Sequence, residues 1–140
     1  MMLKLKEWIA KVSHWMYKTS KSTVSTASGS ATVNSAQFYN LCSVQLSPNS
    51  QYLVFGNVAT NSGATFETIA DFTVTAGSPV NWYDFYGRTT TGSGQGTQAI
   101  AWMQTGASAV TLTLRCYGYN TTSHTETGRI VAIPLSYLGA

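Results

Sequence analysis

The sequence predicts an all-β sandwich preceded by a short N-terminal helix. Residues 37–135 contain short apolar runs of alternating pattern, and turn residues separate these runs at the spacing of a two-sheet sandwich. The chain is 44% hydrophobic and only 9% charged, which favours a folded core beneath a polar, uncharged surface. A chain of 140 residues accommodates one such domain and an appendage.

Residues 1–18 form the expected helix. Its apolar side chains recur at spacings of three and four and form one stripe, made of Leu5, Trp8, Ile9, Val12, Trp15 and Met16. A short helix with such a stripe needs a partner, which could be a self-associating bundle, a socket on another protein or a membrane surface. We expect a protein contact, because the body that follows has the pattern of an assembly module. The interrupting charges exclude a membrane-spanning helix.

Residues 19–30 read TSKSTVSTASGS, a Ser/Thr-rich run without apolar periodicity. Such a run is typical of a linker, so we place the domain boundary near residue 30 and the head domain at residues 31–140. Within the head, strands are expected at about 37–44, 52–58, 66–74, 80–86, 98–103, 110–117 and 129–135. Residues 87–97 and 120–128 are expected to be loops, and no helix is expected in the head.

The stretch 98–119 is expected to form a hairpin, with the small residues 105–109 as its tight turn. Alternation along 110–117 indicates one buried face. The first strand differs, because Ala99, Ala101 and Met103 point one way while Ile100 and Trp102 point the other. Both of its faces are therefore apolar, which fits a sheet placed between its partner sheet and another subunit.

The order of these segments resembles a known family. The segment LSPNSQYLVFG at 46–56, the Trp102 strand with its partner TLTLRCYG, and the terminal GRIVAIPL resemble the jelly roll of tumour necrosis factor and the complement heads. The pattern is most similar to the versions on bacteriophage fibre tips and capsids. The resemblance implies a jelly-roll homotrimer with aromatic contact faces, for which we expect Phe55, Trp102, Tyr117 and Tyr119. A long stalk is not expected, because one short helix precedes the head.

Charge and cysteine content indicate which binding partners and which cellular compartment to expect. The net charge of +3 comes from the lysines of residues 1–21, whereas the rest of the chain is nearly neutral, so nucleic-acid binding is not expected. Cys42 and Cys116 lie in apolar strand patterns, where buried thiols are expected in preference to a bridge. With no secretory signal evident, we expect assembly in a cytoplasm. The resemblance implies that this is a host cytoplasm and that the assembled protein resides in a virion.

Catalytic, metal and cofactor sites are not expected. The chain has only two histidines, neither of them spaced with an acid and a nucleophile, and it has no G-x-S-x-G motif. His124 and Glu126 are two residues apart and would point the same way on an extended segment, but two ligands do not close a metal site. We expect both to lie in a solvated loop.

The expected function is that of a non-enzymatic virion structural protein. The predicted trimeric head would be displayed on a phage particle, with residues 1–18 bound to another virion protein. The alternative is a glycan-binding adhesin that contacts a host surface glycan through loop residues Arg88, Asn120 and His124. The aromatic run 82–86 is a second candidate for sugar stacking, although we expect it in the core or at a subunit interface.

Overall fold

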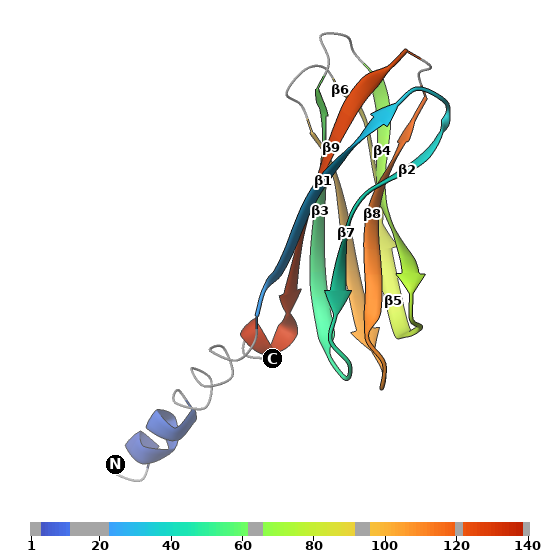
Figure 1. The fold of residues 1–140 in the computed structure, drawn as a ribbon. Coiled ribbons are helices and arrows are strands. Elements are labelled where there is room, and N and C mark those ends of the chain that lie inside the picture. The colour runs from blue at the N-terminus through green and yellow to red at the C-terminus, as the bar shows by residue number, and fades with distance from the viewer. Residues whose placement is uncertain (1–3, 12–22, 62–65, 92–95, 120–121, 139–140) are drawn as a thin grey trace.

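A computed structural model describes residues 4–11, 23–61, 66–91, 96–119 and 122–138. Residues 4–11 are helical, and the remainder is a β-sandwich (Figure 1). The elements are β1 (Ser25–Val33), β2 (Gln37–Leu46), β3 (Gln51–Asn61), β4 (Phe66–Ala76), β5 (Pro79–Phe85), β6 (Gly87–Thr91), β7 (Gly96–Thr105), β8 (Val110–Gly118), β9 (His124–Pro134) and the 3-10 helix η1 (Leu135–Leu138).

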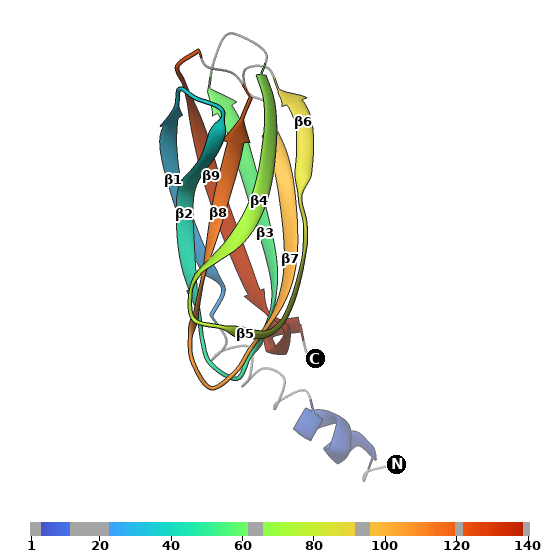
Figure 2. The same ribbon diagram turned by 90° about the vertical axis from the view of Figure 1, so that its right-hand side faces the viewer.

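Two antiparallel sheets make up the sandwich. The five-stranded sheet has the order β1-β9-β3-β7-β5, and the four-stranded sheet has the order β2-β8-β4-β6. Figure 2 looks onto the four-stranded sheet. The start of β1 and the C-terminal η1 lie at the same end of the sandwich (Figure 1). The predicted all-β class is confirmed.

The core lies between the sheets, where the alternating positions of facing strands meet. The predicted inward residues of β7, Ala99, Ala101 and Met103, are buried there. Along β8 the predicted inward set is fully buried as well, namely Val110, Leu112, Leu114 and Cys116. Sequence alternation therefore identified which side of each strand enters the core.

The predicted linker is wrong at its C-terminal end. Residues 25–30 belong to β1, which pairs with β9 over its full length, from Ser25 opposite Ala132 to Val33 opposite His124. Ala27 and Ala31 pack against the core. A Cβ on Gly29 would collide with the Leu41 carbonyl oxygen, so the small residues that suggested a linker allow β1 to approach β2 closely.

The predicted hairpin is also wrong. β7 pairs with β3 and β5, whereas β8 pairs with β2 and β4, so the turn after Thr105 carries the chain from one sheet to the other. Each strand has an apolar face, and the two faces meet across the core instead of lying in one sheet. A small-residue turn is compatible with either connection.

The two predicted loops are shorter than expected. Residues 87–91 form β6, which pairs with β4, and β9 begins at His124. His124 is only 6% exposed and Glu126 is fully buried, so the prediction that they lie in a solvated loop is wrong. The chain also turns into η1 after β9, where no helix was expected.

The N-terminal helix exposes its apolar stripe. Leu5, Trp8 and Ile9 are 56%, 62% and 50% exposed, so nothing in the described chain covers them. The other predicted anchor residues, Val12, Trp15 and Met16, lie outside the described residues. Among the described helices, none has the length and hydropathy needed to cross a membrane.

Candidate interaction surfaces

The outer side of the five-stranded sheet carries two rows of apolar side chains. In one row, Tyr83, Trp102, Leu53 and Ile133 are register partners across β5, β7, β3 and β9. In the next row, Phe85, Ile100, Phe55 and Val131 are partners across the same strands. These eight residues are called the apolar face below.

The apolar face is open to solvent in the single chain. Phe55 and Ile100 are 40% and 38% exposed, and Tyr83 and Phe85 on the edge strand β5 reach 66% and 73%. Tyr83 stacks on Trp102, with ring centroids 5.8 Å apart and ring planes inclined by 24°. The sheet thus has apolar groups on both sides, as predicted from β7.

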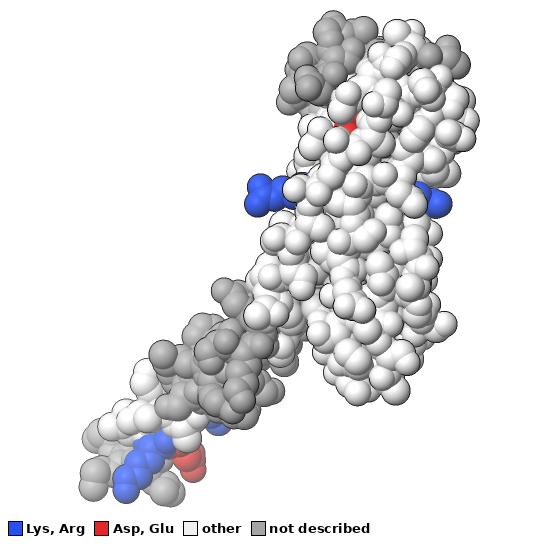
Figure 3. Space-filling model, viewed as in Figure 1, with Lys and Arg blue, Asp and Glu red and all other residues white. Residues whose placement is uncertain are grey.

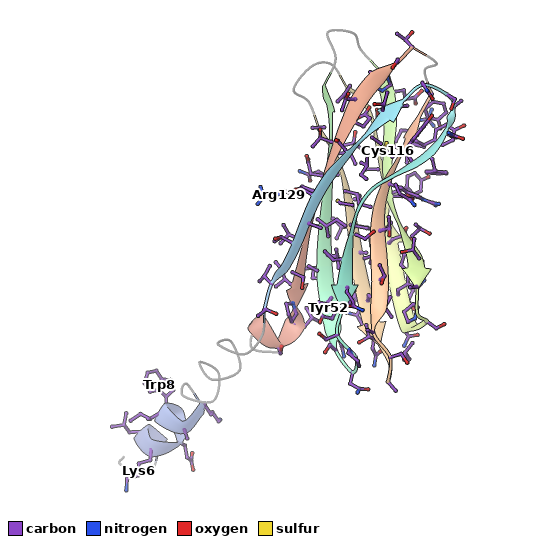
Figure 4. The ribbon with its side chains drawn as sticks, in the orientation of Figure 1. Lys6, Trp8, Tyr52, Cys116 and Arg129 are labelled. Carbon is purple, nitrogen blue, oxygen red and sulfur yellow. The ribbon has the colours of Figure 1, made fainter. Side chains whose placement is uncertain are left out.

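A shallow hollow of about 140 Å³ opens beside this face, between Phe55, Val131 and Arg129. Arg129 projects outward from β9 (Figure 4). Charged atoms are sparse over the visible surface of the sandwich (Figure 3). An apolar hollow beside one cation is a shape that a partner's aromatic side chain and carboxylate could fill.

The four-stranded sheet presents a different outer surface, which combines aromatic rings and arginines. Tyr117 makes edge contacts with Phe38 and Tyr119, with ring centroids 4.9 and 4.8 Å apart. The guanidinium of Arg115 lies 4.0 Å from the Phe38 ring centroid, and that of Arg88 lies 5.4 Å from the Tyr119 centroid. These five residues are called the aromatic–arginine face.

Both arginines of this face are neutralised within the chain. Arg115 donates two hydrogen bonds to Asp71, from Nε to Oδ1 at 2.6 Å and from the second guanidinium nitrogen to Oδ2 at 2.9 Å. These bonds raise the pKa of Arg115 above its usual value. Arg88 pairs with Glu67 through its Nε. The face is therefore aromatic and polar without a net charge.

A buried polar cluster ties the two sheets together. The Glu126 carboxylate on β9 accepts hydrogen bonds from Thr60 on β3, at 3.0 and 3.1 Å, and from Thr68 on β4, at 3.1 Å. His124 Nε2 lies 3.1 Å from Glu126 Oε1, and its Nδ1 lies 2.8 Å from the Thr122 carbonyl oxygen. The side chains of His124 and Glu126 are 1% and 0% exposed, so a substrate could not reach them without opening the sandwich.

The predicted interface residues fall into two groups. Phe55 and Trp102 belong to the apolar face, whereas Tyr117 and Tyr119 belong to the aromatic–arginine face on the other sheet. Their role in a trimer contact stays a prediction, but they lie on two outer faces, because β7 and β8 belong to different sheets and not to one hairpin.

The predicted receptor-contact residues are not brought together as exposed loop residues. Arg88 is exposed on β6, His124 is buried at the start of β9, and Asn120 lies outside the described residues. Burial thus removes His124 as a direct contact. In the aromatic run, Trp82 packs against the core, while Tyr83, Phe85 and Tyr86 are exposed.

Sequence reasoning missed three other members of the apolar face, namely Leu53, Val131 and Ile133, whereas Tyr83 and Phe85 were expected in the core or at a subunit interface as part of the run 82–86. The available signal was that β3, β5 and β9, like β7, have apolar residues pointing to both sides of the strand. Two-sided apolar strands in one sheet place their outward residues on one common surface.

Reactive groups in the described chain are few. Both cysteines are free thiols in the structure; Cys116 is buried and Cys42 is partly buried, and burial raises the pKa of Cys116 to about 12. No cluster of three or more metal-ligating His, Cys, Asp or Glu side chains occurs among the described residues.

Comparison with known proteins gives no relative from which a role could be transferred. No protein-family model matches the chain, and no curated protein matches it. The geometry of the outer faces therefore carries the functional argument.

Proposed function

We propose that this chain is a non-enzymatic virion structural protein whose sandwich is a jelly-roll head that forms a homotrimer on a phage particle. The trimer part rests on the apolar face, and the anchor part rests on the exposed stripe of the N-terminal helix. The virion setting rests on the sequence resemblance to phage fibre and capsid heads.

The strand order supports a jelly roll. If β5 is set aside as an edge addition, each sheet has four strands, β1-β9-β3-β7 and β2-β8-β4-β6, and successive strands mostly alternate between the sheets. Paired sheets of four strands joined by crossovers between them are the pattern of two Greek keys. β5 extends the sheet that carries the apolar face, because it pairs with β7.

The single observation that carries assembly is the exposure of the apolar face. Monomeric proteins rarely leave a contiguous apolar patch of several hundred square ångströms in water. Burying one large side chain such as Phe55 or Ile100 stabilises an interface by about 1.5–3 kcal/mol. Several such residues in two adjacent rows could together support a stable contact between copies.

Ring closure restricts which surfaces can take part. The apolar face and the aromatic–arginine face lie on opposite sides of the sandwich. Copies joined through two opposite sides would line up as an open filament, since a ring of three needs contact surfaces inclined to each other. We therefore assign the trimer contact to the apolar face and leave the aromatic–arginine face outside it.

The anchor assignment follows from the N-terminal helix. Its exposed Leu5, Trp8 and Ile9 would bury their apolar area in a socket on another virion protein. The chain enters β1 at one end of the sandwich, so the opposite end would point away from an anchored N-terminus (Figure 1). Trp8→Ala with Leu5→Ala should leave the head trimeric but reduce its incorporation into particles.

Assembly is tested by polar substitution of the apolar face. Phe55→Ser with Ile100→Ser should convert the trimer to monomers in light scattering at micromolar concentration, with an unchanged circular dichroism spectrum. The matched control is Phe38→Ser, an equally exposed aromatic on the other sheet. A trimer that survives the double substitution would refute the assignment of the contact to this face.

A glycan-binding role is the second candidate, and the aromatic–arginine face favours it. Phe38 and Tyr119 are about as exposed as Phe55, and they would remain open in the proposed trimer. Sugar rings stack on such aromatic faces through their C–H groups, and a surface without net charge suits neutral sugars. Tyr119→Ala should abolish attachment to host envelopes without altering the oligomer, whereas unchanged attachment would exclude this face.

A further inference from the structure

The charges of the sandwich are paired within the chain, with two exceptions. Arg88 pairs with Glu67 and Arg115 with Asp71, and Glu126 is buried against His124, which carries a charge only when protonated. Arg129 and Asp84 have no ion pair among the described residues, although both are exposed. The field of Asp84 contributes to the raised pKa of Arg115, but both of that guanidinium's hydrogen bonds to a carboxylate go to Asp71.

The two unpaired charges cannot meet within one chain. Arg129 lies on β9 and Asp84 on β5, and β3 and β7 separate these strands. Three strand spacings of about 4.8 Å each keep them about 14 Å apart across the sheet. In register, Arg129 aligns with Asn57 and Gln98, whereas Asp84 aligns with Ala101, which adds a shift along the strands.

Their settings are complementary. Arg129 lines the hollow beside Phe55 and Val131 on the apolar face. Asp84 lies on the edge strand β5 and aligns with the buried Ala101, so it points away from the apolar face that carries Phe85. Tyr86, which is 67% exposed, follows two residues later. One surface is thus an apolar hollow with a cation, and the other is an aromatic edge with an anion.

We propose that Asp84 of one copy pairs with Arg129 of the next copy, and that Tyr86, two residues after Asp84, fills the hollow beside that arginine. The contact is heterologous, because an edge meets a face, and an edge and a face are inclined as ring closure requires. This inference rests on the proposed trimer and names its second surface. Charge pairs of this kind fix the register of an interface and exclude wrong arrangements.

Charge reversal tests the pairing. Arg129→Asp and Asp84→Arg should each raise the dissociation constant of the trimer at least 10-fold, because each places like charges opposite one another in every interface. The double variant should restore the wild-type value to within about 3-fold. Gln45→Asp, which adds a charge on the exposed outer side of the other sheet, should leave the constant unchanged.

Disulfide trapping provides a second readout that does not depend on affinity. In a Cys42→Ala background, Asp84→Cys with Arg129→Cys should yield cross-linked dimers and trimers on a non-reducing gel, whereas either cysteine alone should not. If the wild type is a trimer but the double charge reversal does not restore affinity and the double cysteine variant does not cross-link, this pairing is overturned while the proposed assembly stands. A monomeric wild type would overturn both.

Discussion

The buried carboxylate of Glu126 is the position at which one substitution should destabilise the sandwich most. It accepts hydrogen bonds from Thr60 in its own sheet and from Thr68 in the other sheet, and it lies 3.1 Å from His124 Nε2. These contacts join the two sheets at one point. Removing one partner of a buried ion pair costs about 3–5 kcal/mol, and Glu126 forms such a pair with His124 when the imidazole is protonated. That loss is a large share of the 5–15 kcal/mol by which domains are typically stable.

Glu126→Ala should therefore lower the free energy of unfolding by about 3–5 kcal/mol in urea titrations followed by tryptophan fluorescence. Glu126→Gln keeps the shape and one acceptor oxygen, so its loss should be smaller, about 1–3 kcal/mol. Thr127→Ala is the matched control, since this neighbour is exposed and should change stability by less than about 0.5 kcal/mol. Chain concentration must be equal in all titrations, because assembly contributes to apparent stability.

Equal midpoints and slopes for Glu126→Ala and Thr127→Ala would refute the view that the cluster ties the sheets together. A loss for Glu126→Gln as large as that for Glu126→Ala would show instead that the negative charge, and not the shape of the acceptor, carries the effect.

Three further predictions concern the core. Gly56→Val should lower the free energy of unfolding by at least about 1–3 kcal/mol in urea, because a Cβ there would lie 2.7 Å from Leu114 Cδ1 and 2.8 Å from Phe72 Cζ; an unchanged value would contradict the packing. Thr97→Val should raise the free energy of unfolding by about 1 kcal/mol, since the buried Thr97 hydroxyl has no hydrogen-bond partner in the described chain. A lower free energy of unfolding would indicate that the hydroxyl does have a partner. Burial and the nearby Glu126 raise the pKa of Cys116 from 9.0 to about 12, so the stability from its retained proton is complete below pH 9 and lost as pH rises towards 12. The stability difference between wild type and Cys116→Ala should shrink accordingly between pH 8 and 11, and a constant difference would exclude a shifted thiol.

The sequence allowed the class of the fold and the inward side of most strands to be predicted. Alternation along β7 and β8 identified residues such as Met103 and Leu114 as core because side chains on a strand change sides at every residue. The same test of hydrophobic alternation did not reveal β1. Its inward residues are Ala27, Gly29 and Ala31, whose small size serves close packing and gives no hydrophobic signal.

Strand pairing could not be predicted from local pattern. Alternation places an apolar face on β7 and on β8, but it does not specify whether the two faces lie in one sheet or oppose each other. The same limit placed Tyr117 beside Trp102 in the expected interface, although the structure puts them on opposite sheets. His124 and Glu126 were missed because polar residues were assigned to a loop, whereas hydrogen bonds from Thr60 and Thr68 allow the acid to be buried.

The mass of the wild-type chain in solution tests the central claim most directly. Multi-angle light scattering at micromolar concentration should give three times the chain mass of 15.1 kDa. The Phe55→Ser, Ile100→Ser variant should give the mass of one chain under the same conditions. A wild-type protein that elutes as a monodisperse monomer across this range would contradict the assembly role assigned to the apolar face.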